Sequence, residues 1–426
     1  MKSSITINAA QIIERSMNHI DLRLMHHGKR VGFFVYRVLR NKGYSDAQLR
    51  DFILLGILHD VGAFKTEELD KMVHFETNDV WGHSIYGYLF MKYFSPMRSL
   101  APVLLYHHSD VAQSACLSPE AQKLALLIHL CDRADLFYLG PDGYDDFCIY
   151  LSKKRGTRFT DEVVDLFIDA KIQKADVIAM ESDADFNRIL YETPMSNDAA
   201  LAFMRMVIYS IDFRSPQTML HTFALRLVAR KLAEIMGMDE ESIVRIETAA
   251  LLHDIGKMGT PLSILEGTHK LTNEEYAVMQ QHVIMSEEIL IGCINEDILQ
   301  MAINHHERVD GTGYPKQIPM ANRPAGERLM AVADVLSALL GSRSYKQSFP
   351  KERVLSILEK MRGNHLDATM VDLAIDHYDT LCEVMAQHTA PIEEMYNTIE
   401  REQAAINAMV NKGEFDFTEF FADCYA

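Results

Sequence analysis

The chain has 426 residues, of which 48% are hydrophobic and 24% charged, and its formal net charge is −18. This length allows two or three domains with cores of their own, and the acidic balance argues against a long nucleic acid as a partner. Scattered cysteines without CxxC spacing fit a reducing compartment, and no apolar run reaches the length of a membrane helix, so we expect a cytoplasmic protein without membrane contact.

Apolar residues recur at three- and four-residue intervals through most of the chain. Two such stripes run over residues 31–38 and 225–235. This spacing is typical of amphipathic helices, and the alternating runs typical of strands are scarce. The sequence therefore predicts an all-α fold.

The first half carries residue types that bind metals, in a fixed order. At its centre is the segment Ile57-Leu58-His59-Asp60-Val61-Gly62-Ala63. Histidines and aspartates in apolar surroundings are costly unless a cation or strong hydrogen bonds compensate them. We therefore favour metal binding here over a metal-free relic of the fold. The set consists of His27, His59, Asp60, His83, His107, His108 and Asp132.

A boundary is predicted near residue 195. An acidic run at residues 181–185 precedes a turn-rich stretch at residues 192–198. The two halves on either side of this point resemble each other, since residues 363–372 follow the pattern of residues 156–165. We expect two tandem helical bundles, in domains 1–195 and 196–426.

The second half repeats the metal-binding set, and its central segment, Leu251-Leu252-His253-Asp254-Ile255-Gly256-Lys257, ends in lysine where the first copy has Ala63. Imidazole and carboxylate ligands suit iron or manganese better than calcium or magnesium. Two such ions activate water and neutralise phosphate charge. The set consists of His221, His253, Asp254, His282, His305, His306 and Asp334.

At these residues the chain resembles the HD-domain phosphohydrolases, and in its second half their HD-GYP branch. The resemblance covers about residues 215–375 and rests on residues 253–257, on His305-His306-Glu307 and on Asp310-Gly311-Thr312-Gly313-Tyr314-Pro315. It implies a phosphodiesterase that opens a cyclic dinucleotide to a linear 5′-phosphorylated product with two or three metal ions, often iron or manganese. The tandem layout is similar to vibrio phosphodiesterases for 3′,3′-cyclic GMP-AMP (cGAMP), so we expect that substrate first and cyclic di-GMP next.

The resemblance also implies roles for single residues. The first ion would be held by His221, His253, Asp254 and Asp334. The second would be held by His282, His305 and His306, with Asp254 bridging. Lys257 would act with Asp254 in catalysis by contacting the scissile phosphate. Tyr314, Arg343 and Lys346 would bind the substrate.

Two positions depart from the family pattern. Three-metal members carry a glutamate where this chain has Gln217, and a neutral amide is a poor metal ligand, so we expect two ions. Many members carry an aspartate near the base where this chain has Ser337. Its absence leaves room for an adenine-containing substrate.

The first domain lacks the phosphate lysine and the whole Gly-Tyr-Pro loop. We therefore expect no cyclic-dinucleotide hydrolysis there, and our hypothesis is a 5′-nucleotidase-type phosphatase acting on the linear product. The competing hypothesis is regulation, in which this domain senses a nucleotide or stabilises a homodimer. A helical tail from about residue 390 is interpreted as a packing helix or an oligomer contact.

Two alternatives remain for the second domain. One is a receptor that binds a cyclic dinucleotide without turnover and relays it to a protein partner. The other is a different HD hydrolase acting on deoxynucleotides or guanosine tetraphosphate, against which the Gly-Tyr-Pro loop argues.

Overall fold

The structure, a computed structural model, describes residues 5–19, 25–64, 81–140, 143–213, 216–265, 267, 269–340 and 349–425. Over these residues every regular element is a helix, and the β-structure consists of isolated bridges alone. The all-α prediction is confirmed for this part of the chain. Within it, no helix combines the length and the apolar content that crossing a membrane requires.

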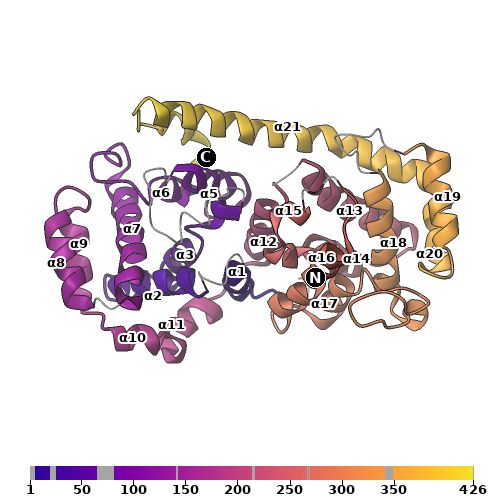
Figure 1. Ribbon diagram of the computed structural model, residues 1–426, viewed down its shortest axis with the longest axis horizontal. Helices are drawn as coiled ribbons and strands as arrows, with labels where there is room; N and C mark the ends of the chain where they lie inside the picture. The colour runs from indigo at the N-terminus through magenta and orange to yellow at the C-terminus, as the bar shows by residue number, and fades with distance from the viewer. Residues whose placement is uncertain are drawn as a thin grey trace. The chain divides into compact units, whose positions relative to one another are not determined.

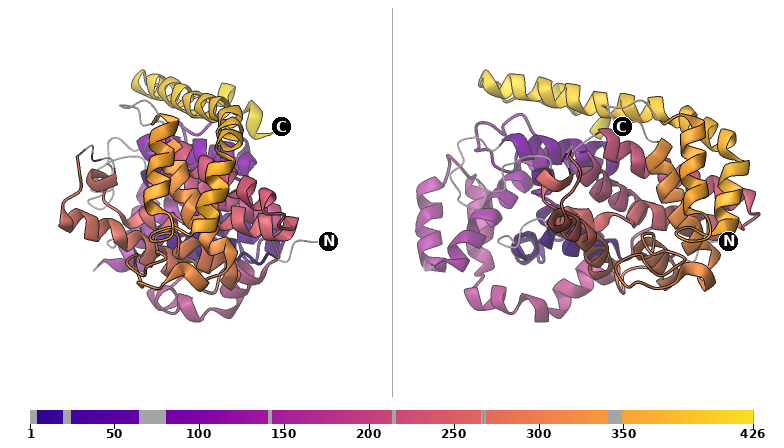
Figure 2. Two further views of the ribbon diagram at one scale, coloured as in Figure 1. Left: turned by 90° about the vertical axis from the view of Figure 1, so that its right-hand side faces the viewer. Right: turned by 45° about the vertical axis from the view of Figure 1, so that its right-hand side comes forward.

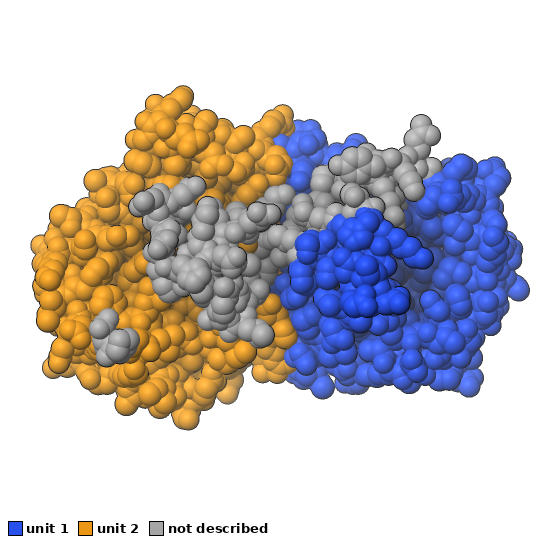
Figure 3. Space-filling model, viewed as in Figure 1, with its two compact units in different colours: residues 1–7, 211–398 blue, residues 8–210, 399–426 orange. Residues whose placement is uncertain are grey.

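The chain forms two compact units (Figure 3). We call residues 8–210 with 399–426 the N-terminal unit, and residues 1–7 with 211–398 the C-terminal unit. The boundary between the units lies within α12 (Asn197–Asp212). Tyr209, on the N-terminal side of this boundary, packs its ring 5.0 Å from that of Phe94 in the same unit. The domain limits 1–195 and 196–426 stay a prediction, because compactness alone does not define a domain.

The N-terminal unit is built from short and medium helices (Figure 1). Several begin at a capping side chain: Ser45, for example, closes a capping box with Gln48. The helices are α1 (Ala9–Asn18), α2 (His27–Leu39), α3 (Asp46–Ile57), η2 (Val61–Phe64), α5 (Trp81–Phe94), η3 (Arg98–Leu100), α6 (Ala101–Leu105), α7 (Pro119–Leu139), α8 (Tyr144–Lys154), α9 (Asp161–Ala170), α10 (Lys174–Ile178), η4 (Met180–Ser182), α11 (Ala184–Asn187), η5 (Arg188–Glu192) and most of α12.

The C-terminal unit repeats this succession. Its helices are α13 (Pro216–Ile235), α14 (Glu240–Leu252), η6 (Ile255–Gly259), α15 (Leu262–Leu265), α16 (Asn273–Leu290), α17 (Glu296–Ile303), η7 (Met320–Asn322), α18 (Ala325–Leu340), α19 (Lys351–Met361), α20 (Ala368–Asp376) and most of α21 (Tyr378–Asn411). The end of α21 belongs to the N-terminal unit, together with η8 (Thr418–Phe420) and η9 (Ala422–Cys424).

The same helix pairs pack in both units. In the N-terminal unit α2 contacts α3 and α7, while α5 contacts η2 and α6. In the C-terminal unit α13 contacts α14 and α18, while α16 contacts η6 and α17. Figure 2 shows the helices from two further sides. The two bundles therefore share one architecture, and the prediction of tandem bundles is confirmed.

The likeness extends to a turn outside the ligand set. Gly156 and Gly363 both have positive φ angles, 69° and 79°, where a glycine is favoured. The arginine before each glycine forms an ion pair with an aspartate of the next helix, at the same sequence separation. Arg155 pairs with an aspartate of α9, and Arg362 pairs with Asp372 of α20. This confirms the predicted match between residues 156–165 and 363–372.

The C-terminal tail packs within the N-terminal unit. The helix predicted from about residue 390 begins at Tyr378, and its residues from 399 belong to that unit. Glu402 accepts a hydrogen bond of 2.7 Å from Lys92, and both side chains are largely buried. Further on, Phe415 stacks on Trp81 with the ring centroids 5.4 Å apart. Both contacts are made to α5, the helix that carries His83.

We predict that Glu402→Ala destabilises the N-terminal unit by about 3 kcal/mol, because removing one partner leaves the Lys92 ammonium buried and unpaired. Trp81, the only tryptophan in the sequence, reports on this unit, so urea unfolding followed by its fluorescence measures the loss. Glu414→Ala, which removes an exposed carboxylate from the same tail, is the control. Equal unfolding midpoints for the two variants would contradict the prediction.

Candidate metal centres

A close helix approach creates the centre of the C-terminal unit. His253 and Asp254 follow the last residue of α14, and the chain then turns through η6. At Gly256 a Cβ atom would lie 2.0 Å from the carbonyl oxygen of His282, so only glycine permits η6 to lie against α16. This approach brings His282 opposite the Asp254 carboxylate.

Asp254 lies between two sets of imidazoles. Its Oδ2 is 2.8 Å from Nε2 of His253, and its Oδ1 is 3.3 Å from Nε2 of His282. Asp334 of α18 lies 3.3 Å from Nε2 of His221, on α13, and 3.9 Å from Nδ1 of His306. The ligand atoms cluster as His221, His253 and Asp254 on one side, and as His282, His305 and His306 on the other.

The tautomers of three histidines are fixed by the backbone. Nδ1 of His253, His282 and His305 lies 2.9, 2.6 and 2.6 Å from the carbonyl oxygen three residues earlier. Since a carbonyl oxygen can only accept, Nδ1 carries the hydrogen and donates the hydrogen bond. The lone pair of Nε2 is then left for a metal ion. Such carbonyl bonds are the usual second contact of metal-binding histidines.

The atoms aimed at the centre fit a cation. Nε2 of His253, His282 and His305 and Oδ1 of Asp254 are buried and have no hydrogen-bond partner. Burial, reinforced by the neighbouring imidazoles, holds the pKa of His305 well below its usual range. Burial would raise the pKa of Asp254, but the charges on His253 and Lys257 hold it well below its usual range. The neutral imidazole of His305 and the ionised carboxylate of Asp254 are in the form that binds divalent ions.

Lys257 reaches this centre from η6. Its Nζ contacts Oδ2 of Asp254. Although burial alone would lower the pKa of Lys257, the Asp254 carboxylate raises it, so the side chain is a cation at neutral pH. A cation beside the shared carboxylate is well placed to stabilise negative charge on a bound phosphate.

Glu307, for which no separate role was predicted, holds the segment that follows the Gly-Tyr-Pro loop. Glu307 is 1% exposed, and its two carboxylate oxygens accept backbone hydrogen bonds from Lys316, at 2.6 Å, and Ile318, at 3.0 Å. Tyr314 packs its ring 4.6 Å from the His306 ring, so it lies at the edge of the centre. Its direct contact with substrate stays a prediction.

We predict that Gly313→Ala raises the Michaelis constant for the substrate at least about tenfold while the metal content is retained. A Cβ atom there would lie 2.5 Å from both the Glu307 Cα and the His306 carbonyl oxygen, so the loop must move. Thr312→Ala, an exposed change in the same loop, is the control. Steady-state kinetics and metal analysis measure the effect, and an unchanged Michaelis constant would contradict it.

Three predicted positions need separate mention. Arg343 and Lys346 lie outside the described residues, and so does the side chain of Gln217. Ser337 is fully buried, 3.3 Å from Nδ1 of His221, and donates a hydrogen bond to the Asp334 carbonyl. The wider choice of base that was inferred from the missing aspartate stays a prediction.

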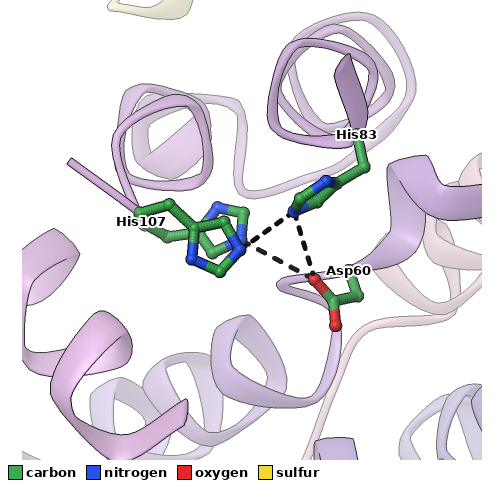
Figure 4. Close-up of side chains that lie close together, drawn as sticks. Asp60, His83 and His107 are labelled. Carbon is green, nitrogen blue, oxygen red and sulfur yellow. Dashed lines mark hydrogen bonds and ion pairs between the residues drawn. The ribbon is translucent and has the colours of Figure 1, made fainter. Parts of the chain in front are cut away.

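The N-terminal unit repeats the arrangement around Asp60 (Figure 4). Oδ2 of Asp60 is 3.2 Å from Nε2 of His59, while Oδ1 is 3.5 Å from Nε2 of His83 and 3.7 Å from Nε2 of His107. The clusters are His27, His59 and Asp132 on one side, and Asp60, His83, His107 and His108 on the other. Nε2 of His59, Nε2 of His107 and Oδ1 of Asp60 are buried without a hydrogen-bond partner, as in the other unit.

The two centres differ in the contacts behind them. Nδ1 of His27 lies 2.7 Å from Asp135, which occupies the position of Ser337, and Arg30 also binds this carboxylate. Burial would lower the pKa of His27, but the bonds with Asp132 and Asp135 raise it to about 10. Ala63, in the place of Lys257, is buried and brings no cation.

Residues 205–370, which include all seven predicted ligands of the C-terminal unit, match a protein-family model described as HD domain. This part of the chain is an HD domain. HD domains are metal-dependent, and the histidine and aspartate clusters seen here could hold metal ions. In the N-terminal unit the family match covers only residues 205–210.

Several proteins of known activity resemble the chain. The 3′3′-cGAMP-specific phosphodiesterase 1 of Vibrio cholerae is 25% identical over 386 residues, which are 85% of this chain and 89% of that protein. The 3′3′-cGAMP-specific phosphodiesterase 2 of the same organism is 34% identical over 42% of this chain and 34% of its own length. The cyclic di-GMP phosphodiesterase response regulator RpfG of Xanthomonas campestris is 39% identical over 38% of this chain and 44% of its length.

The fold is also found among solved structures. A crystal structure of cyclic GMP-AMP-specific phosphodiesterases in V. cholerae (V-cGAP3) superposes with a TM-score of 0.55 at 16% identity. It covers 88% of this chain and 98% of that chain. The likeness shows that the architecture is shared across both units.

Proposed function

We propose that the HD domain hydrolyses a cyclic dinucleotide to a linear 5′-phosphorylated dinucleotide, with 3′,3′-cGAMP preferred and cyclic di-GMP next. The observation that carries this is the Asp254 carboxylate shared between two imidazole sets, with Lys257 beside it and Tyr314 at its edge. The preference rests on the V. cholerae relative named for cGAMP, whose similarity extends over most of both chains.

The ligand set supports two ions of iron or manganese, one on each side of Asp254. When bound, such ions activate water at neutral pH and neutralise charge on the phosphate. Lys257 then stabilises the charge that develops on the phosphate oxygens as the 3′-oxygen leaves. Tyr314 stays a neutral phenol, since burial raises its pKa, and it lies where a base or sugar can pack against His306.

Initial rates with cGAMP, cyclic di-GMP and cyclic di-AMP test the proposal on the full chain loaded with manganese or iron. We expect the highest kcat/KM for cGAMP, loss of all hydrolysis on chelation and recovery on adding metal back. Binding of a cyclic dinucleotide to the metal-loaded protein without any turnover would instead establish the receptor alternative.

For the N-terminal unit we propose a metal-dependent phosphatase that removes the 5′-phosphate from the linear product. Its support is the repeated cluster around Asp60, combined with Ala63 and the missing Gly-Tyr-Pro loop, which remove the features specific to cyclic substrates. Full-length Asp254→Asn protein supplied with the linear product should release phosphate. If it releases none while retaining metal, the competing regulatory role is favoured.

A further inference from the structure

A cavity of about 310 Å³ opens beside the candidate metal cluster of the N-terminal unit. It lies where the chain leaves the His107-His108 pair, which is where the C-terminal unit carries its Gly-Tyr-Pro loop. Its volume is at the lower end of the range for small-molecule sites. The lining residues are His108, Asp110, Gln113, Lys154, Thr157 and Arg158.

A buried histidine holds one of the two cations in this lining. His129 is 0% exposed and lies on α7, and its Nδ1 is 3.0 Å from the carbonyl oxygen of Ser109. Nδ1 therefore donates, so Nε2 is the acceptor and receives the Nε–H of Arg158 at 3.2 Å. This bond uses the inner edge of the guanidinium and leaves its terminal nitrogens available to a ligand.

The cations in the lining are not neutralised by carboxylates of the described residues. Neither Lys154 nor Arg158 forms an ion pair with a described carboxylate. Asp110 also lines the cavity, but its Oδ1 accepts the backbone N–H of Gln113 at 2.8 Å. The cavity thus joins two cations to His108, which belongs to the cluster around Asp60. A phosphate group matches this combination, because a guanidinium binds its oxygens through two parallel hydrogen bonds.

The arrangement is particular to the N-terminal unit. His129 stands three residues before Asp132, and the equivalent position before Asp334 is Ala331. Arg158 stands two residues after Gly156, and the equivalent residue of the C-terminal unit is His365. The unit that lacks a phosphate lysine is therefore the one that has an arginine held by a buried histidine.

We propose that Arg158, positioned by His129 and assisted by Lys154, binds the phosphate group of a phosphomonoester ligand at the N-terminal centre and replaces the missing lysine. This inference rests on the proposed metal binding around Asp60. Arg158 and Lys154 would contact the ligand directly, whereas His129 would act only through Arg158.

Calorimetric titration of inorganic phosphate tests this on full-length, manganese-loaded Asp254→Asn protein, which silences the other centre. We expect Arg158→Ala to weaken phosphate binding at least about tenfold, since it removes charge-assisted hydrogen bonds to the phosphate. Arg158→Lys should recover part of the affinity. Lys153→Ala, which removes an exposed charge next to Lys154 on α8, should leave the affinity unchanged. The metal content should be equal in all variants.

His129→Ala separates positioning from structure. It should weaken phosphate binding in the parent protein but add nothing in the Arg158→Ala background. Equal phosphate affinity in Arg158→Ala, Arg158→Lys and the parent, with metal retained, would overturn the inference while leaving the metal centre intact. If Asp60→Asn removed no metal from the parent protein, the proposed centre itself would be wrong, and the inference would fall with it.

Discussion

Asp254→Asn is expected to abolish cyclic-dinucleotide hydrolysis, with a loss of at least about 10³-fold, and to release metal from the HD domain. Asparagine keeps the size of the side chain but removes the charge and turns one oxygen into a donor. Both oxygens of Asp254 face imidazoles, at 2.8 Å from His253 and 3.3 Å from His282, so one substitution affects both proposed ions.

The internal repeat supplies the matched control. Asp60→Asn makes the same change at the equivalent position of the N-terminal unit, and we expect it to leave cyclic-dinucleotide hydrolysis intact. Rates with cGAMP and metal counts by atomic emission measure both variants. Full activity in Asp254→Asn, or loss of hydrolysis only in Asp60→Asn, would show that the wrong unit has been chosen.

Lys257→Ala is expected to lower kcat by about 10²–10³-fold while both metal ions stay bound. The pairing with Asp254 keeps this lysine charged, and its loss removes charge stabilisation on the phosphate without removing a ligand. Lys316→Ala, which breaks an ion pair with Glu287 outside the cluster, is the control and should keep its kcat. Loss of metal in Lys257→Ala would assign the lysine a structural role instead.

The ligand pattern was accessible from sequence because each histidine and aspartate recurs in the same order on helices of the same succession. Periodicity gave the helices, and the apolar neighbours of Asp334 indicated burial. The two sets on either side of Asp254 came from the family resemblance, and the structure brings the same side chains together. Their action as ligands remains a proposal that the metal counts above test.

Contacts between distant segments were not accessible in this way. Phe415 packs on Trp81 although the two residues lie far apart in the chain, and no local sequence pattern predicts this contact. In the sequence Glu307 could be recognised only as part of a motif. Its role depends on the direction in which the backbone N–H groups of the loop point, which no local pattern predicts. The bond from Arg158 to His129 likewise depends on a turn that meets α7. Local spacing predicts which face of a helix is buried, but not what it meets.

The residue three positions after the last ligand differs between the two units. Both Ser337 and its counterpart Asp135 contact the first histidine of their set. The substitution changes the partner of a proposed metal ligand, from a carboxylate in one unit to a hydroxyl in the other. The link between this position and the preferred base stays a prediction.

The most direct test of the central claim is the product formed from 3′,3′-cGAMP in ¹⁸O-labelled water by the full chain with manganese bound. Hydrolysis at the HD domain predicts a linear dinucleotide whose 5′-phosphate carries one ¹⁸O atom, detected by mass spectrometry, and the Asp60→Asn variant should prevent any later loss of that phosphate. Unchanged cyclic nucleotide in the presence of bound metal would contradict the account.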